Sequence, residues 1–541
     1  MAQFNNSNAL LNGSVLELFG SIDADTITLS GDYLIDGATS GLVDGNGGVD
    51  TLVLSAANLA NTTISNIAQT VLEASALDDI SDIDVEQLGN LGTITLGPGA
   101  SALGMGTLRL VSPVIEGAPI ENLSFAVVLD LLDGETFRMI NTAYRTNLTV
   151  DFASSSFAGT SGVEYTGNNG NDTVLANSGD DIINGGRGQD LIYAGAGNDL
   201  VNANQHNDIV YGEAGDDSIW GNGGNDELHG GTGNDAVGGG WGDDVLYGDA
   251  GDDFLMGHNG VDYLYGGNDD DLLEGGVDGD VIDGGSGHDI LYYYYSSAAV
   301  IVDLGAGTAS GGHAEGDSYT GIEGVSGSNF ADTLTGNEAA NTLIGNGGDD
   351  ILNGLGAGDT IEGGAGNDII NGGDGQDELH GGDDNDTITG GSNDDVIFGD
   401  AGIDDLSGDD GRDQLHGGEG ADTIRGGAAN DRLWGDEADD FLFGDGGRDE
   451  LRGGDGNDSL TGGGQNDTFI FAEGDDTDTI TDFSNNQDII GFVGPDIDFT
   501  SLTITDGADG HVYIDYGSGD QIIVLNAAGQ INASDFVFNL A

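Results

Sequence analysis

The chain has 541 residues, of which 102 are glycine, 97 are acidic and nine are basic, for a formal net charge of −88. There is no cysteine or lysine, which excludes disulfides, thiolate catalysis and Schiff-base chemistry on lysine. The absence of a basic patch argues against a nucleic-acid partner, and no apolar stretch approaches the ~18 residues of a transmembrane helix.

Residues 1–163 predict a β-rich, solenoid-like domain. Its opening residues lack the basic segment and apolar run of a secretory signal, so export would need a secretion signal elsewhere in the chain. Residues Ile64–Leu77 could form a short helix instead of strands. Two stretches with β-type runs resemble decayed repeats, Asp23–Leu29 and Gly47–Leu54. Further β-type runs are expected at residues 93–96, 107–111, 125–129 and 148–152.

A strict nine-residue period begins in residues 164–291 and returns in residues 332–470. An aspartate recurs at every ninth position, with Asn341 as a substitute, glycines precede it, and an apolar residue follows two positions later. The predicted metal ligands, called the array aspartates below, are Asp172, Asp181, Asp190, Asp199, Asp208, Asp217, Asp226, Asp235, Asp244, Asp253, Asp262, Asp271, Asp280 and Asp289 in the first array, and Asp332, Asp350, Asp359, Asp368, Asp377, Asp386, Asp395, Asp404, Asp413, Asp422, Asp431, Asp440, Asp449, Asp458 and Asp467 in the second.

A nonapeptide divides into a glycine-rich turn and a short strand, so two of them make an 18-residue coil of a parallel β-roll. Stacked coils lie about 4.8 Å apart and bring aspartates and backbone carbonyls together. Ca²⁺ prefers six to eight hard oxygen ligands, so the arrays predict a calcium cofactor on the order of 20 ions, whose binding energy is also folding energy.

The segment between the arrays, residues 292–331, predicts a β insert. Tyr292–Tyr295 within it could be a carbohydrate-binding platform, but a strand pair that covers the open end of an array is the favoured interpretation. Residues 471–541 shift to β-type runs with aromatics, which predicts a C-terminal β cap. The expected fold is therefore all-β: a right-handed parallel β-roll or β-helix solenoid with two calcium-binding arrays between an N-terminal β-solenoid and a C-terminal cap.

The G-G-x-G-x-D pattern, as in Gly363–Asp368, resembles the RTX (repeats-in-toxin) family of secreted bacterial proteins. The resemblance covers about residues 164–541. It implies calcium binding, export by a type I secretion system from a signal in residues 471–541, and folding outside the cell, where calcium is millimolar.

In the family that the repeats resemble, RTX repeats are often joined to enzymes, so catalytic patterns bear on the function. There is no H-E-x-x-H or G-x-S-x-G pattern, so we expect no enzyme activity, although a site hidden in residues 1–163 stays open. His229, His380 and His416 share one repeat position and are expected to be surface turn residues rather than metal ligands.

The favoured function is a structural protein of the bacterial surface, extracellular and self-assembling with calcium, such as a surface-layer (S-layer) or matrix subunit. The alternative is a calcium-dependent adhesin or carbohydrate-binding protein with residues 1–163 as its recognition head. Expected partners are further copies of the chain, cell-surface polysaccharide and the secretion machinery.

Overall fold

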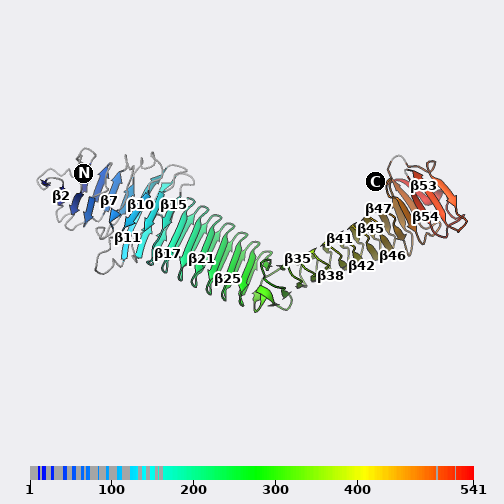
Figure 1. Cartoon of the computed structure of the whole chain (residues 1–541), viewed down its shortest axis with the longest axis horizontal. Coiled ribbons are helices and arrows are strands. Elements are labelled where there is room, and N and C mark those ends of the chain that lie inside the picture. Colours follow the sequence, from blue (N-terminus) through cyan, green and yellow to red (C-terminus); the bar gives the residue numbers. More distant parts are fainter. Residues whose placement is uncertain are drawn as a thin grey trace. The chain divides into compact units, whose positions relative to one another are not determined.

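The computed structural model is an all-β parallel solenoid (Figure 1). It describes residues 148–152, 162–494, 497–517 and 519–540 in full, and of the preceding chain only the backbone of individual strands. The chain forms two compact units, residues 1–287 and 288–541. Within the described residues there is no helix of the length and apolar character needed to cross a membrane.

The first part of unit 1 is built from short strands, and all pair in parallel except β1 with β2. Their bounds are β1 (Leu10–Asn12), β2 (Val15–Phe19), β3 (Thr26–Leu29), β4 (Ser40–Asp44), β5 (Thr51–Ser55), β6 (Thr62–Ser65), β7 (Gln69–Glu73), β8 (Ile83–Asp84), β9 (Thr93–Leu96), β10 (Thr107–Val111), β11 (Asn122–Leu131), β12 (Phe137–Asn141), β13 (Asn147–Asp151), β14 (Ser156–Phe157) and β15 (Val163–Thr166). The β-type runs expected here are confirmed as strands.

The possible helix over Ile64–Leu77 is wrong. This stretch contains β7, whose residues pair in parallel with β5 on one side and β9 on the other. The β-branched and aliphatic residues of Gln69–Glu73 fit this pleated position between two strands better than an isolated helical turn.

In the first array each coil contributes two strands, and strands of alternate number form two parallel rows. The register confirms the 18-residue coil, because Leu191 pairs with Ile209 and Ile209 with Glu227. The strands are β16 (Thr173–Leu175), β17 (Ile182–Arg187), β18 (Leu191–Ala196), β19 (Leu200–Gln205), β20 (Ile209–Ala214), β21 (Ser218–Gly223), β22 (Glu227–Thr232), β23 (Ala236–Trp241), β24 (Val245–Ala250), β25 (Phe254–Asn259), β26 (Tyr263–Asn268), β27 (Leu272–Val277) and β28 (Val281–Ser286).

Unit 2 begins with the insert and continues as a second solenoid of the same kind. The hairpin of β30 and β31 starts one of its rows, since β30 pairs in parallel with β34. The strands are β29 (Ile290–Tyr292), β30 (Ile301–Asp303), β31 (Thr308–Ser310), β32 (Ser318–Thr320), β33 (Gly324–Ser326), β34 (Thr333–Asn337), β35 (Thr342–Gly347), β36 (Ile351–Gly356), β37 (Thr360–Ala365), β38 (Ile369–Asp374), β39 (Glu378–Asp383), β40 (Thr387–Ser392), β41 (Val396–Ala401), β42 (Asp405–Asp410), β43 (Gln414–Glu419), β44 (Thr423–Ala428), β45 (Arg432–Glu437), β46 (Phe441–Gly446), β47 (Glu450–Asp455) and β48 (Ser459–Thr461).

The insert does contain a strand pair, but the tyrosine run does not form it. Only Tyr292 ends a strand, while Tyr294 and Tyr295 lie in a turn. Tyr293 is buried, and its hydroxyl donates a hydrogen bond to Asp317 Oδ2 at 2.9 Å. The run therefore anchors the turn through one buried ring, while its neighbours pack edge to face on the surface.

The C-terminal cap extends both rows of unit 2. The strands β49 (Thr468–Phe471), β51 (Ile489–Val493) and β55 (Phe536–Leu540) continue one row in parallel. The other row continues through β50 (Thr477–Ile480) to β54 (Asp520–Val524), then turns antiparallel into β53 (Val512–Gly517) and β52 (Thr503–Asp506). This change of direction ends the 18-residue repeat.

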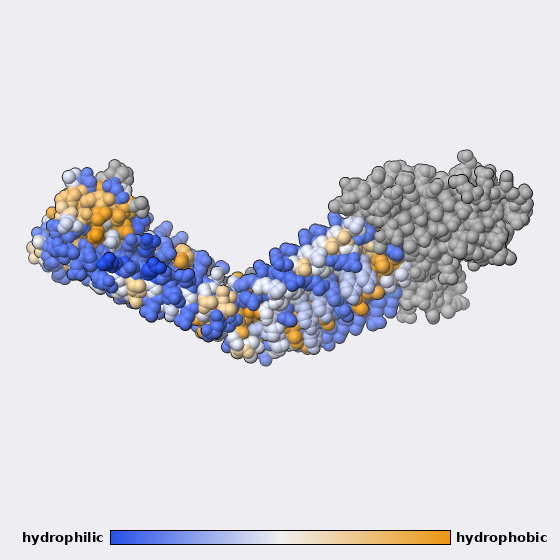
Figure 2. All heavy atoms as spheres, turned by 180° about the vertical axis from the view of Figure 1, so that it is seen from behind, coloured by the Kyte–Doolittle hydropathy of each residue, from blue (hydrophilic) through white to orange (hydrophobic). Residues whose placement is uncertain are grey.

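The solenoid core is one apolar residue per nonapeptide, placed two residues after each array position. All these side chains are at most 1% exposed, which confirms the predicted inward face. On the face seen in Figure 2 the arrays are largely hydrophilic, and apolar side chains gather over the C-terminal end. Within residues 471–540 the exposed large apolar side chains include Phe499, Ile504 and Val537.

Candidate metal centre

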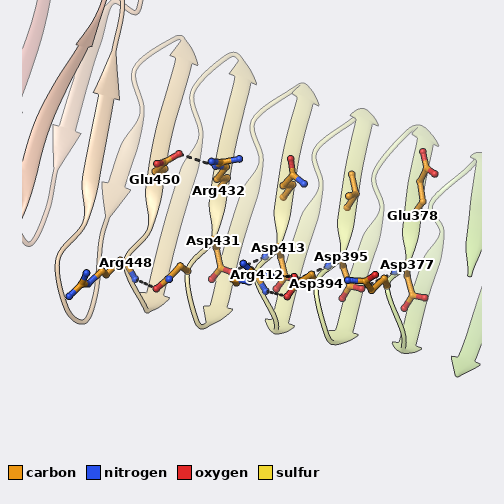
Figure 3. Close-up of a pocket in the computed structure, with 14 residues that line it drawn as sticks. Asp377, Glu378, Asp394, Asp395, Arg412, Asp413, Asp431, Arg432, Arg448 and Glu450 are labelled. Carbon is orange, nitrogen blue, oxygen red and sulfur yellow. Dashed lines mark hydrogen bonds and ion pairs between the residues drawn. The ribbon is translucent and has the colours of Figure 1, made fainter. Parts of the chain in front are cut away.

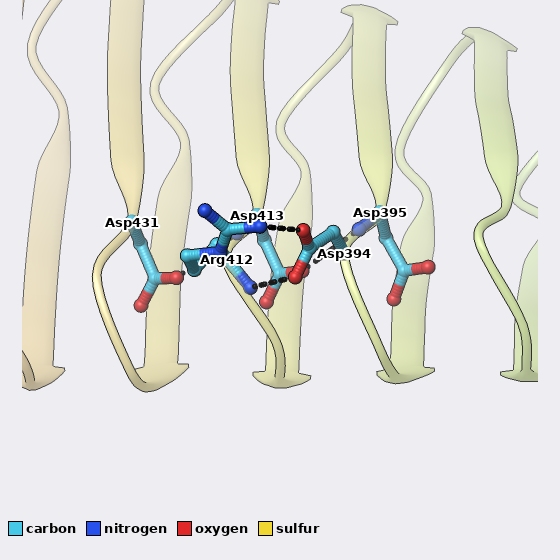
Figure 4. Close-up of polar contacts among 5 residues, drawn as sticks. All are labelled: Asp394, Asp395, Arg412, Asp413 and Asp431. Atoms are coloured by element: carbon cyan, nitrogen blue, oxygen red, sulfur yellow. Dashed lines mark hydrogen bonds and ion pairs between the residues drawn. The ribbon is translucent and has the colours of Figure 1, made fainter.

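Every predicted metal ligand lies at the end of a turn, immediately before a strand, and is buried. None of the array aspartates is more than 2% exposed, and Asn341 is equally buried. The stacking of coils places them in two rows, one for each row of strands. Figure 4 shows three members of one row, Asp395, Asp413 and Asp431, on successive coils.

One carboxylate oxygen of each array aspartate is used for structure. The backbone N–H of Asp395 donates to Asp413 Oδ1 at 2.9 Å, and the N–H of Asp413 donates to Asp431 Oδ1 at 3.0 Å. The same 18-residue contact recurs along both arrays. Each aspartate therefore caps the backbone of the coil before it, which would otherwise keep a buried donor unpaired.

The other oxygen, Oδ2, is buried and has no hydrogen-bond partner along the interior of both arrays. This holds for the run from Asp190 to Asp262 and for the run from Asp350 to Asp458. A buried, unpaired carboxylate oxygen carries a large desolvation penalty, and its repetition in register indicates a row of sites for positively charged ligands.

At many of these positions a backbone carbonyl of the next coil lies near the same glycine as the unpaired oxygen. A Cβ built on Gly221, five residues before Asp226, would clash with both Asp226 Oδ2 and the carbonyl oxygen of Gly239. Gly363 stands in the same relation to Asp368 Oδ2 and Gly381 O. Two oxygen atoms thus converge above one glycine, an arrangement that repels itself unless a cation or a proton lies there.

The first array departs from this pattern at three positions. Ala176, Ala194 and Ala203 replace the glycine five residues before Asp181, Asp199 and Asp208. Their methyl groups occupy the space that the glycines leave open, so these coils offer less room than those from Gly212 onward.

Burial raises the pKa of the array aspartates well above the ordinary value of 3.8. It raises the pKa of Asp217 to about 6, and that of Asp413 to about 7. For Asp350 the pKa reaches about 8, with burial as the main cause and repulsion from Asp368 and Asp332 adding to it. Without a cation, the folded arrays therefore hold carboxyl groups that resist ionisation near neutral pH.

At the beginning of each array, protein donors bind the second carboxylate oxygen of the aspartate. Asp172 Oδ2 accepts a hydrogen bond from the hydroxyl of Tyr165 at 2.9 Å, and Asp181 Oδ2 accepts one from the backbone of Asn177 at 3.0 Å. Asp332 Oδ2 accepts the backbone N–H of Ser328. These three predicted ligands have both carboxylate oxygens occupied.

Two aspartates beyond the nine-residue period complete the rows and were missed by the sequence analysis. Asp478 Oδ1 accepts the N–H of Asp458 at 3.0 Å, and Asp488 Oδ1 accepts the N–H of Asp467 at 3.1 Å. Their coils are 20 and 21 residues long, so the period hides them. The pattern of an aspartate followed two residues later by isoleucine, at Ile480 and Ile490, could have found them.

A second, exposed row of side chains was also missed. The residue directly before an array aspartate is often Asn or Asp, and its Oδ1 accepts the backbone N–H of the matching residue one coil later. Asp180 accepts from Asn198 at 3.1 Å, and Asn198 accepts from Asp216 at 3.0 Å. This exposed row links the coils at their outer edge. Its hydrogen bonds run from a later coil to an earlier one, whereas those of the buried row run from an earlier coil to a later one.

The three histidines of one repeat position lie on strands β22, β39 and β43, not in turns as expected. They take part in stacks of rings from successive coils. His229 lies between Tyr211 and Tyr247, with ring centroids 4.7 and 4.3 Å away. In the second array His416 packs on Trp434 at 4.2 Å.

The donor set fits calcium. Within the described residues, no three Asp, Glu or His side chains converge as a metal site, so an ion in the arrays would draw its remaining ligands from backbone oxygens. Carboxylate and carbonyl oxygens without nitrogen or sulfur are the ligands that Ca²⁺ selects. The unpaired Oδ2 atoms and the converging carbonyls supply both kinds.

Comparison with known proteins gives a family. The model of the RTX calcium-binding nonapeptide repeat matches eleven overlapping segments that together span residues 166–293 and 326–478, more than half of the chain. No curated protein matches the chain. Among solved structures it is similar to the extracellular lipase LipA of Serratia marcescens, at 15% identity over 62% of this chain and 40% of that chain, with a TM-score of 0.12. The chain thus spans less than half of the lipase, and a likeness this weak carries no argument about activity.

Proposed function

Since the chain belongs to the family of RTX calcium-binding nonapeptide-repeat proteins, we propose that it is a secreted structural protein that folds and self-assembles with calcium at a bacterial surface. An S-layer or extracellular matrix subunit is the specific role we infer. The repeats bind Ca²⁺, and the family is typically exported by type I secretion, so the site of action we propose is extracellular.

The proposal depends on the runs of buried, unpaired Oδ2 atoms. Interior positions from Gly212 onward, such as Asp226 and Asp368, would hold ions with the carbonyl oxygens that converge above the preceding glycines. Bound calcium supplies the positive charge that these buried oxygens lack. Asp172, Asp181 and Asp332 would serve as ends of the rows, because protein donors already occupy their carboxylates.

Calcium would also make the chain able to associate with itself. With −88 net charge, neighbouring copies repel each other strongly until divalent ions neutralise part of the charge. A rigid solenoid with exposed carboxylates on repeated coils offers many equivalent contacts to the next copy. We propose no catalytic role, since most of the buried unpaired polar atoms of the described residues are aspartate oxygens repeated along the arrays rather than groups gathered in one site.

The test is a calcium titration of the full chain from zero to ~10 mM, above the range of extracellular calcium modules. Circular dichroism and light scattering would be recorded on the same sample. We expect a transition from disorder to β structure, followed by growth into large particles. Folding without growth would overturn the self-assembly, and an adhesin headed by residues 1–163 would then be the better explanation.

A further inference from the structure

The second array carries a polar groove of about 750 Å³ along one edge of the solenoid (Figure 3). Two rows of side chains line it over five coils. The lower row consists of the residues directly before five array aspartates, and the upper row of the residues directly after them. The lower row is Gln376, Asp394, Arg412, Asn430 and Arg448, and the upper row includes Glu378, Arg432 and Glu450.

Arginine side chains gather at the groove in a chain that has few of them. Five of the nine arginines lie between residues 412 and 452, and the chain has no basic residue between 188 and 411. Three of the five line the groove. Arg412 pairs with Asp394, and Arg432 pairs with Glu450 at 3.0 Å. The guanidinium of Arg448 has no ion-pair partner among the described residues.

The spacing of the two lower arginines is set by the solenoid. Arg412 and Arg448 occupy the same position two coils apart, which corresponds to about 10 Å along the row. The backbone of each is held in register by the side chain one coil earlier in the row: Asp394 Oδ1 accepts the N–H of Arg412 at 3.1 Å, and Asn430 Oδ1 accepts that of Arg448 at 2.9 Å.

The first array carries carboxylates at the same spacing. The equivalent row before β17, β19, β21, β23 and β25 alternates Asp180, Asn198, Asp216, Asn234 and Asp252. The three aspartates are exposed and lie two coils apart, again about 10 Å. Each is oriented by a hydrogen bond to the next coil, as in Asp216 Oδ1, which accepts the N–H of Asn234 at 3.0 Å.

We propose that the groove binds a second copy of this chain, with Arg412 and Arg448 engaging two neighbouring carboxylates of the row Asp180, Asp216 and Asp252 of that copy. The inference rests on the proposed self-assembly and names its contact. Guanidinium and carboxylate form charge-assisted, often bidentate pairs, and two rigid rows of equal spacing can form both pairs at once. The contact joins different surfaces, so it repeats from copy to copy.

A polyanion without this spacing is a poorer occupant. Glu378, Asp394 and Glu450 also line the groove and repel anions that do not place their charges at the arginines. The repeat of two coils, present on both surfaces, favours the second copy over an acidic polysaccharide.

The first experiment compares the full chain with the variant Arg412→Gln/Arg448→Gln by sedimentation velocity, in saturating calcium and low salt. The control is Arg425→Gln, an arginine of β44 in the other row of strands, which pairs with Asp405 at 2.8 Å outside the groove. We expect the double variant to need about tenfold more protein to assemble, because two complementary charge pairs are lost, and the control to match the wild type. Circular dichroism should show the same calcium-induced folding in all three.

A charge exchange makes the test specific. The variant Arg412→Asp/Arg448→Asp and the variant Asp180→Arg/Asp216→Arg should each assemble poorly alone, because the contact then joins like charges. An equal mixture should assemble, since each copy then meets opposite charge on the other.

The outcomes separate the two proposals. If the wild type assembles and the groove variants assemble equally well, the proposed contact is wrong but the proposed self-assembly is supported. A wild type that stays monomeric at every calcium concentration would overturn the self-assembly, and with it a second copy in the groove. Binding of alginate by wild-type monomers that Arg412→Gln/Arg448→Gln abolishes would assign the groove to an acidic polysaccharide instead.

Discussion

The two carboxylate oxygens of each array aspartate have different roles. Oδ1 caps the preceding coil, as when Asp413 accepts the N–H of Asp395, while Oδ2 is left for a cation. An asparagine can accept the same hydrogen bond but carries no charge. Asn341 is as buried as its neighbours but makes a different contact: its Nδ2 donates to the carbonyl oxygen of Glu323 in the preceding coil at 2.9 Å, and its Oδ1 accepts the N–H of Asn337 at 2.7 Å.

The change Asp413→Asn should therefore preserve the fold in high calcium and remove binding of about one or two ions, since each ion lies between coils that share the row. Isothermal titration calorimetry would measure the stoichiometry, and circular dichroism the calcium midpoint, which should rise. Asn341→Asp is the matched control and should not lower the number of ions. An unchanged stoichiometry in Asp413→Asn would contradict the assignment of Oδ2.

The glycine that lies five residues before most array aspartates is a second feature at the residue scale, because its lack of a side chain leaves space beside Oδ2. Gly212→Ala would place a methyl group against Asp217 Oδ2 and the carbonyl of Gly230. We expect fewer bound ions and a loss of stability of about 1–3 kcal/mol, as is usual for overpacking. Gly223→Ala is the control, because its Cβ would meet only one atom, 3.7 Å away. Calcium-dependent thermal unfolding of both variants measures the difference, and equal unfolding temperatures would count against the crowding.

At the scale of the strands, the stacks of rings join coils on the outer faces. Tyr193, Tyr211, His229, Tyr247 and Tyr265 form one stack on alternate strands β18 to β26, with neighbouring centroids 4.3 to 5.0 Å apart. The faces of the rings cover one another, so only their edges meet solvent. This geometry suits cross-strand stabilisation rather than a flat platform for sugars.

The replacement Trp434→Ala should lower the free energy of unfolding by about 0.5–1.5 kcal/mol beyond the loss of buried area, because its ring packs face to face on His416. Trp241→Ala is the control, since this tryptophan is 71% exposed. Denaturant unfolding at fixed calcium would compare them. If both substitutions cost the same, the stack does not stabilise the array.

Much of the element scale could be predicted from the sequence, because a coil of two nonapeptides constrains strand, turn and core together. Leu379 pairs with Ile361 and Ile397, as the period requires. Asp478 and Asp488 were not predicted because their irregular coils break the nine-residue period, although both aspartates accept the same kind of hydrogen bond. The tyrosine run was wrongly expected to form a strand pair, because consecutive aromatic residues favour strands locally. The burial of Tyr293 and the turn after it depend instead on tertiary contacts.

For the whole molecule, calcium and protons compete for the same buried oxygens. Burial raises the pKa of Asp217 to about 6 and of Asp350 to about 8, against 3.8 in the unfolded chain. A group whose pKa is raised by folding stabilises the fold fully below its unfolded pKa, and this contribution is lost as the pH rises through the folded pKa.

Without calcium, the arrays should therefore be most ordered near pH 4 and lose β structure as the pH rises towards about 8. Circular dichroism in a chelator, recorded as a function of pH, checks the direction, and saturating calcium should abolish most of the dependence above pH 6. Equal β content at pH 4 and pH 8 in the chelator would show that the buried carboxylates are not the cause.

The buried rows also have a polarity, because each aspartate completes the coil that precedes it. The last two amides of the second array, those of Asp458 and Asp467, are completed only by Asp478 and Asp488 of the cap. The two ends of the second array are therefore chemically different, and its last coils find their acceptors in the cap, outside the repeat. If the C-terminal end of the chain meets calcium first, the folded cap offers its acceptors to the last coils of the array, and each folded coil then offers acceptors to the coil before it. Folding would then proceed from the C-terminal end of the array towards its N-terminal end.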